Sequence, residues 1–147
     1  MISPFSDEYF MKQALAEARL AAAEDEVPVG AVIVYGDRII ARAHNQTERL
    51  NDPTAHAEML AITSATASLG AKYLTGCRLY VTVEPCVMCA GAIGWSQLPA
   101  LIYGAPDEKR GFSAYASCAL HPKTEVRNGV MEDECAALIR DFFKNKR

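Results

Sequence analysis

The sequence lacks several features that mark particular classes of protein. No basic segment followed by an apolar stretch opens the chain, so no secretory signal is predicted, and no internal repeat, low-complexity segment or linker interrupts it. We expect a single domain over residues 1–147, large enough to bury roughly 70% of its unfolded surface. The formal net charge of −3 is small and by itself neither favours nor excludes nucleic acid as a partner.

A disulfide framework is also missing. The five cysteines are an odd number, and only Cys86 and Cys89 have a recognisable spacing, C-x-x-C. Together with the missing secretory signal, this pattern favours a reducing, cytoplasmic setting. Residues 85–106 carry no charge and are long enough to span a bilayer, but glycines and prolines divide them. They are therefore predicted to form a buried short helix and strand rather than a membrane span.

Hydrophobic periodicity predicts helices and strands that alternate along the chain. Ser6 is expected to cap the first helix and Asp52 the second, with Pro53 as the first helical residue of the second. A hairpin followed by alternating elements predicts an α/β fold with a mixed sheet and helices on both faces. The expected helices are 8–24, 53–70, 86–95 and 132–146. The expected strands are 28–35, 38–44, 77–83, 100–105 and a short one within 124–130, and residues 106–124 are expected to be irregular.

The stretch "EPCVMC" at residues 84–89 admits three interpretations. A thioredoxin-like redox pair lies where a strand meets a helix, as this one does, so position alone does not exclude it. A structural zinc site needs a fourth ligand at compact spacing, yet the remaining histidines and cysteines form no second C-x-x-C or H-x-x-x-H. A catalytic zinc site needs three ligands, one position open to water and a nearby carboxylate.

The segment "AHAE" at residues 55–58 supplies what the catalytic interpretation requires. His56 joins Cys86 and Cys89 as the ligands, and Glu58 is the carboxylate. The cysteines lie at a helix N-terminus, where the helix dipole favours thiolate. One difficulty is that positions 56 and 58 of an ideal helix lie about 200° apart, so periodicity does not direct both toward one metal. We favour catalytic zinc, with structural zinc and a redox pair as alternatives.

The combined pattern H-x-E and P-C-x-x-C is the signature of zinc nucleobase deaminases. In that chemistry, hydroxide attacks the ring carbon that carries the exocyclic amine. Glu58 is expected to take the water proton, pass it to a ring nitrogen and finally protonate the departing ammonia. The main-chain N–H groups around Ala57 and Cys86 are expected to face the tetrahedral centre.

Several longer stretches resemble the bacterial tRNA-specific adenosine deaminases. They are "EVPVGAVIV", "NDPTAHAEMLAI", "LYVTVEPCVMCAGAI", "IYGAPDEKRG" and "DECAALIRDFF", in that order over nearly the whole chain. The resemblance implies a three-layer α/β/α cytidine deaminase-like fold with a mixed five-stranded sheet, one zinc ion per subunit and a homodimer. It also implies deamination of adenosine to inosine at the wobble position of a tRNA anticodon stem-loop.

The resemblance also assigns individual residues. It implies that His56, Cys86 and Cys89 bind the zinc and that Glu58 transfers protons. It implies that Asn45 hydrogen-bonds the flipped nucleotide and that Val29 forms a wall of the base pocket. It also implies that Asp107 and Lys109 contact the anticodon backbone and that Phe143 closes over the anticodon. Ordinary roles compete with three of these: Val29 in the core, Asn45 in a turn and Lys109 in solvent.

The chain departs from the family pattern in loops expected to face RNA. Gln97 replaces a usual arginine, Ala114-Tyr115 replaces a usual Gly-Ser pair, and the stretch "HPKTEV" is short. The stretches "LGAKYL" and "GAIGW" also resemble the guanine deaminases of the same superfamily. A deaminase of free nucleobases or nucleosides, of the guanine or cytosine type, is therefore the alternative function.

Overall fold

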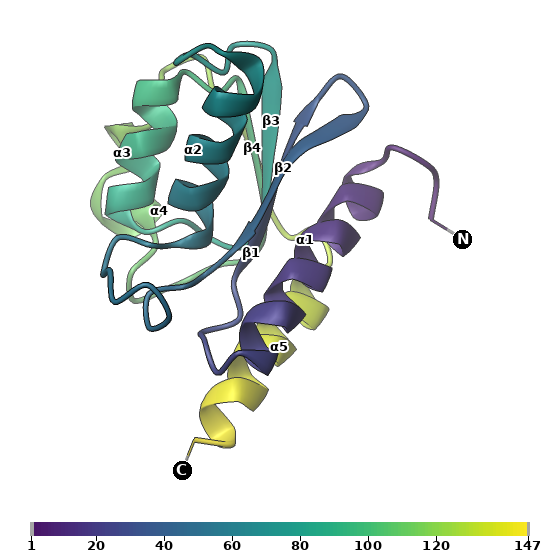
Figure 1. Ribbon diagram of the computed structural model, residues 1–147, viewed down its shortest axis with the longest axis vertical. Helices are drawn as coiled ribbons and strands as arrows, with labels where there is room; N and C mark the ends of the chain where they lie inside the picture. Colours follow the sequence, from purple (N-terminus) through teal and green to yellow (C-terminus); the bar gives the residue numbers. More distant parts are fainter. Residues whose placement is uncertain (1, 147) are drawn as a thin grey trace.

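The structure is a computed structural model that describes residues 2–146, and it is built around one mixed β-sheet (Figure 1). The strands follow the order β2-β1-β3-β4-β5. β1 pairs antiparallel with β2 and β3, whereas β3–β4 and β4–β5 are parallel. The bounds are β1 Gly30–Tyr35, β2 Arg38–His44, β3 Cys77–Val83, β4 Ala100–Ala105 and β5 Glu125–Arg127. The mixed five-stranded sheet predicted from the sequence is confirmed.

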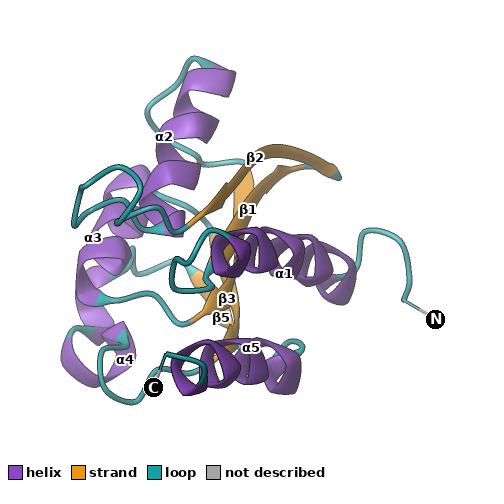
Figure 2. Cartoon of the chain, turned by 60° about the horizontal axis from the view of Figure 1, so that its bottom comes forward, coloured by secondary structure: helices purple, strands orange, loops and turns teal. Residues whose placement is uncertain are grey.

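Helices cover both faces of this sheet, as Figure 2 shows. One face carries α1 and α5, which pack on the cluster that contains Phe10, Val32 and Ile102. The other face carries α2 and α3 over the cluster that contains Ile33 and Leu101. The bounds are α1 Asp7–Ala23, α2 Ala57–Leu69, α3 Val87–Ser96, a short α4 Phe112–Tyr115 and α5 Glu132–Lys144. The three-layer α/β/α arrangement is thereby confirmed.

Local signals in the sequence account for the start of α1 and the end of α2. The Ser6 hydroxyl accepts the Tyr9 N–H at 3.2 Å and caps α1 as predicted. Gly70 ends α2 with φ 65°, a left-handed conformation that glycine adopts without strain. The uncharged run over 85–106 divides into α3 and β4 as predicted. Within residues 2–146, no helix combines the length and the apolar character needed to cross a membrane.

Two helices begin later than predicted. The Asp52 carboxylate accepts the N–H and hydroxyl of Thr54 at 2.8 and 2.7 Å, and the Ala55 N–H reaches the Asp52 carbonyl at 3.1 Å. Asp52 therefore closes a separate turn instead of capping α2, and Pro53 lies in that turn rather than in the helix. His56 follows in extended conformation, with φ −74° and ψ 154°.

A smaller shift occurs at α3. Cys86 is extended, with φ −73° and ψ 175°, and the helix begins at Val87, one residue after the predicted start. The segment predicted to be irregular, 106–124, also contains some regular structure. It holds α4 and a 3₁₀ turn over Ser117–Ala119. These short elements escaped prediction because four or fewer residues show no recognisable hydrophobic period.

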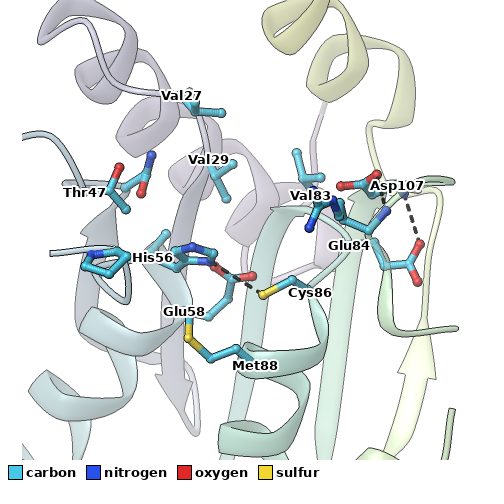
Figure 3. Close-up of a pocket in the computed structure, with 14 residues that line it drawn as sticks. Val27, Val29, Thr47, His56, Glu58, Val83, Glu84, Cys86, Met88 and Asp107 are labelled. Carbon is cyan, nitrogen blue, oxygen red and sulfur yellow. Dashed lines mark hydrogen bonds between the residues drawn. The ribbon is translucent and has the colours of Figure 1, made fainter. Parts of the chain in front are cut away.

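The sheet topology gathers several chain segments at one edge. β2, β3 and β4 end there, and β1, which is antiparallel to β2 and β3, begins there. The loop before β1 and the loops after the other three strands therefore meet, and α2 and α3 begin beside them (Figure 3). The candidate site lies at this edge.

Candidate metal centre and substrate pocket

Three soft ligands converge where α2 and α3 begin. The His56 Nδ1 atom lies 3.6 Å from the Sγ atoms of both Cys86 and Cys89, and one ligand atom from each residue falls within 4.8 Å of the others. Figure 3 shows the His56 ring directed across the pocket toward Cys86. One imidazole and two sulfurs fit a soft-ligand divalent cation such as Zn²⁺. In the described part of the chain the cluster comprises these three residues, one fewer than a closed structural zinc site uses.

The geometric difficulty raised by ideal helix periodicity does not arise here. His56 occupies the N-cap position and is extended, so only Glu58 follows helical geometry. Both side chains therefore reach the same pocket, and both line it. The Glu58 carboxylate lies between the His56 ring and Cys86 in Figure 3, and its residue is only 3% exposed.

The pKa values of the two cysteine thiols are shifted in opposite directions. Hydrogen bonds from the Cys89 thiol, from His56 and from the Cys89 main-chain N–H lower the pKa of Cys86 to about 4. Hydrogen bonding to Cys86 and burial raise the pKa of Cys89. Cys86 is therefore the more acidic of the two thiols, and a cation held by both sulfurs requires both to lose their protons.

Glu58 is prepared for proton transfer by its burial. Burial raises the pKa of this carboxyl from the ordinary value of 4.5 to about 7. A group that titrates near neutrality can both accept and donate a proton at working pH. The position of Glu58, beside the three ligand atoms and inside a pocket, places this capacity where a reacting group would bind.

A pocket of about 470 Å³ opens beside the cluster, within the size range of small-molecule sites. The Asn45 Oδ1 atom in its wall is buried and has no hydrogen-bond partner within the described chain. Buried polar atoms are nearly always paired, so this oxygen is free to accept a ligand's donor. The pocket is lined by Val27, Val29, Asn45, Thr47, Pro53, His56, Ala57, Glu58, Val83, Glu84, Cys86, Met88, Asp107 and Arg110.

The structure brings most of the predicted substrate residues together, but not all of them. Val29, Asn45, Ala57 and Asp107 line the pocket. Lys109 belongs to the same loop as Asp107, yet its exposed side chain is not part of the lining.

The remaining predicted residue, Phe143, lies outside the pocket. It is 49% exposed and lines a neighbouring groove between α5 and the loop after β2. Val27 and Thr47 line both depressions, so the groove continues the pocket.

Sequence reasoning missed several residues of the lining. Glu84, which is 5% exposed, and Arg110, which is exposed, both contribute to the lining. A signal for Glu84 was present, because an acidic residue between a buried strand and the C-x-x-C segment needs a partner. Thr47 and Met88 carried no comparable signal.

Comparison with known proteins identifies the class. Residues 4–105 match the family model of the cytidine and deoxycytidylate deaminase zinc-binding region. The fold and the site therefore define a zinc-dependent deaminase of the cytidine deaminase-like superfamily.

Individual relatives narrow the class. The chain is 47% identical over 146 residues to the tRNA-specific adenosine deaminase of Agrobacterium fabrum, covering 95% of each. The chain belongs to the family of tRNA-specific adenosine deaminases. One similar solved structure comes from studies of A-to-I editing by tRNA:A34 deaminases at the wobble position of transfer RNA. Its TM-score is 0.81 and its sequence identity 46%, and the match covers 88% of this chain and 98% of that one. The guanine deaminase of Bacillus subtilis is less similar, with TM-score 0.68, 42% identity, and coverage of 76% and 70%.

The raised pKa of Glu58 predicts a pH-dependent stability for the metal-free protein. The folded protein holds this proton more tightly than the unfolded chain does. The resulting stabilisation is complete below about pH 4.5 and is lost as the pH rises through about 7. After chelation of any bound metal, urea unfolding measures the free energy of unfolding of wild type and of Glu58→Gln. As the pH rises from about 4.5 to about 7, the value for wild type should fall by up to about 3 kcal/mol more than the value for the variant. Parallel pH profiles of the two proteins would contradict the assigned pKa.

Proposed function

We propose that this protein deaminates adenosine to inosine hydrolytically at the wobble position of tRNA anticodons. The observation that carries the proposal is the convergence of His56, Cys86 and Cys89 beside Glu58, in a chain whose relatives are tRNA-specific adenosine deaminases over 95% of their length. The arrangement combines a three-ligand metal centre, a titratable carboxylate and a pocket of small-molecule size.

The metal proposed for the centre is zinc, one ion per chain. His56, Cys86 and Cys89 would hold it, and their nitrogen and sulfur atoms match the ligands that zinc prefers. When bound, zinc lowers the pKa of a water molecule and so permits hydrolysis at neutral pH.

The side chains of the pocket perform the remaining steps. Glu58 accepts a proton from the attacking water while the water oxygen bonds to the ring carbon that carries the amine. Glu58 then delivers that proton to the adjacent ring nitrogen. It then transfers the second water proton to the amine, and the carbon–nitrogen bond breaks to release ammonia. Asn45 accepts a hydrogen bond from the bound nucleotide, and Val29 packs against the base. The main-chain N–H groups of Ala57 and Cys86 face the reacting carbon.

The groove beside the pocket supports an RNA strand as substrate. A free base would occupy the pocket alone, whereas the neighbours of a flipped nucleotide need an adjoining surface. The groove that contains Phe143 joins the pocket through Val27 and Thr47, and the loop that carries Asp107 and Lys109 forms another rim. Deamination of a free base is the second candidate, favoured by the 42% identity to a guanine deaminase.

Substrate preference and the role of Glu58 are testable together. An anticodon stem-loop with a wobble adenosine should yield inosine, and neither guanine nor cytosine should release ammonia. Glu58→Ala should keep its zinc, measured by metal analysis, and lose about 10²–10⁴-fold in kcat because proton transfer is lost. The control is Glu8→Ala, which removes an exposed acid of α1 outside the pocket. Retained activity in Glu58→Ala would refute its role, and turnover of guanine alone would favour the second candidate.

We further propose a homodimer that forms through α3. Trp95 is 84% exposed and Val87 43% exposed on this helix. A shallow depression beside Trp95 is formed by Gly91, Gly94, Ala119, Leu120 and His121. Exposed tryptophan next to a hollow is typical of protein interfaces.

We also infer that the protein acts in the cytoplasm and as one domain over residues 1–147. The cytoplasmic setting is supported by the five cysteines, all of which are free.

The proposed dimer predicts the effect of one substitution. Trp95→Lys should convert the dimer to a monomer, because a charge would replace the largest apolar side chain of the interface. Light scattering measures the mass, and circular dichroism checks the fold. The matched control is Leu20→Lys, at a 49% exposed apolar position in the last turn of α1, which should leave the mass unchanged. A wild-type monomer, or a dimeric Trp95→Lys, would contradict the proposed interface.

A further inference from the structure

Arg110 differs from every other residue of the pocket lining. Of the described side chains that line the pocket, it alone carries a permanent positive charge. It is exposed, and its guanidinium forms no ion pair or hydrogen bond with any residue between 2 and 146. Because three acids line the same pocket and none is paired with it, Arg110 is available to a ligand.

A tight turn fixes the main chain at Arg110. The Asp107 carboxylate accepts the N–H groups of Lys109 and Arg110 at 3.1 and 3.0 Å, and the Gly111 N–H donates to the Asp107 carbonyl at 2.8 Å. The side chain of Asp107 is thus engaged within its own loop. Its role is to shape the turn from which Arg110 projects.

Glu84 attaches this turn to the metal-binding segment. One carboxylate oxygen accepts the Asp107 N–H at 3.0 Å (Figure 3). The other accepts the N–H of Ser113 at 3.0 Å and its hydroxyl at 2.5 Å. A Cβ atom on Gly111 would lie 2.4 Å from the Glu84 carboxyl carbon, so the turn packs directly on this buried group. Glu84 lies two residues before Cys86, and the turn is therefore held in a fixed position relative to the metal centre.

We propose that Arg110 binds a phosphodiester group of the RNA strand beside the nucleotide in the pocket, and that Glu84 is the positioning residue that holds Arg110 there. The inference rests on the proposed function, because a free nucleobase has no phosphate. Guanidinium forms paired, charge-assisted hydrogen bonds with phosphate, and a turn fixed in advance reduces the entropy lost on binding. The contact is the same in the ground state and the transition state, since it does not involve the reacting atoms.

The first test compares Arg110→Ala with wild type on the anticodon stem-loop. KM should rise about tenfold with kcat nearly unchanged, as expected for loss of uniform binding by one charge-assisted contact. The slope of log(kcat/KM) against log[salt] should become shallower by about 0.7, the value for one phosphate contact with a single strand. Arg110→Lys should restore part of the salt slope. The control Arg38→Ala removes the same charge from an exposed position at the β1–β2 hairpin and should behave as wild type.

The second test separates positioning from general loss of structure. The Glu84→Gln substitution places an amide NH₂ against N–H groups that now donate to the carboxylate, and so disturbs the turn that carries Arg110. With Arg110 present, this substitution should therefore raise KM. In the Arg110→Ala background the same change should raise KM much less, because the two residues act through one contact. Zinc content and melting temperature of each variant show whether the fold is intact.

The outcomes are distinct. If wild type deaminates the stem-loop and Arg110→Ala matches Arg38→Ala in KM and salt slope, the phosphate contact is wrong while the proposed function stands. A raised KM with an unchanged salt slope would also overturn it. Additive effects of Glu84→Gln and Arg110→Ala would overturn the positioning role. Turnover of guanine with none of the stem-loop would overturn the proposed function and the phosphate contact together.

Discussion

The approach of one imidazole to two sulfurs, at the point where two helices begin, is the interaction on which the rest of the site depends. His56 and Cys86 both occupy extended N-cap positions, and Cys89 lies in the first turn of α3. This arrangement places the 3.6 Å contacts between the two helices. It also leaves Glu58 buried beside them, with its pKa raised to about 7. A shift of either helix start by one residue would turn a ligand away.

The sheet converts this local arrangement into a pocket. Because β1 runs antiparallel to both of its neighbours, the loop before it meets the loops after β2, β3 and β4. The loop before β1 places Val29 in the pocket wall, and the loop after β2 adds the unpaired oxygen of Asn45. Glu84, after β3, holds the turn after β4 that carries Arg110. Hence residues far apart in sequence form one rim around the metal centre, while the helices on the other face of the sheet stabilise it.

Much of this organisation could be predicted from the sequence, for reasons that are local. The C-x-x-C and H-x-E spacings predict the ligands and the carboxylate, and the structure places these residues together; alternating elements predict helices on both faces of the sheet. The start of α2 was mispredicted because Asp52 closes its own turn. The buried acidic position of Glu84 was a signal that it needs a partner, but its partners could not be identified, because they lie more than twenty positions away and such hydrogen bonds leave no periodic pattern. Arg110 was missed because an exposed arginine in a loop carries no pattern that distinguishes it from a solvated one.

X-ray absorption at the zinc edge of the purified protein tests the central claim most directly. The spectrum should show one zinc per chain with two sulfur neighbours and one imidazole nitrogen, and no fourth ligand from the protein. Loss of the ion in Cys86→Ser, with the fold retained, would identify the sulfur donor. A spectrum with a further sulfur or second imidazole, or a metal-free protein with Cys86 joined to Cys89 in a disulfide, would contradict an open catalytic centre.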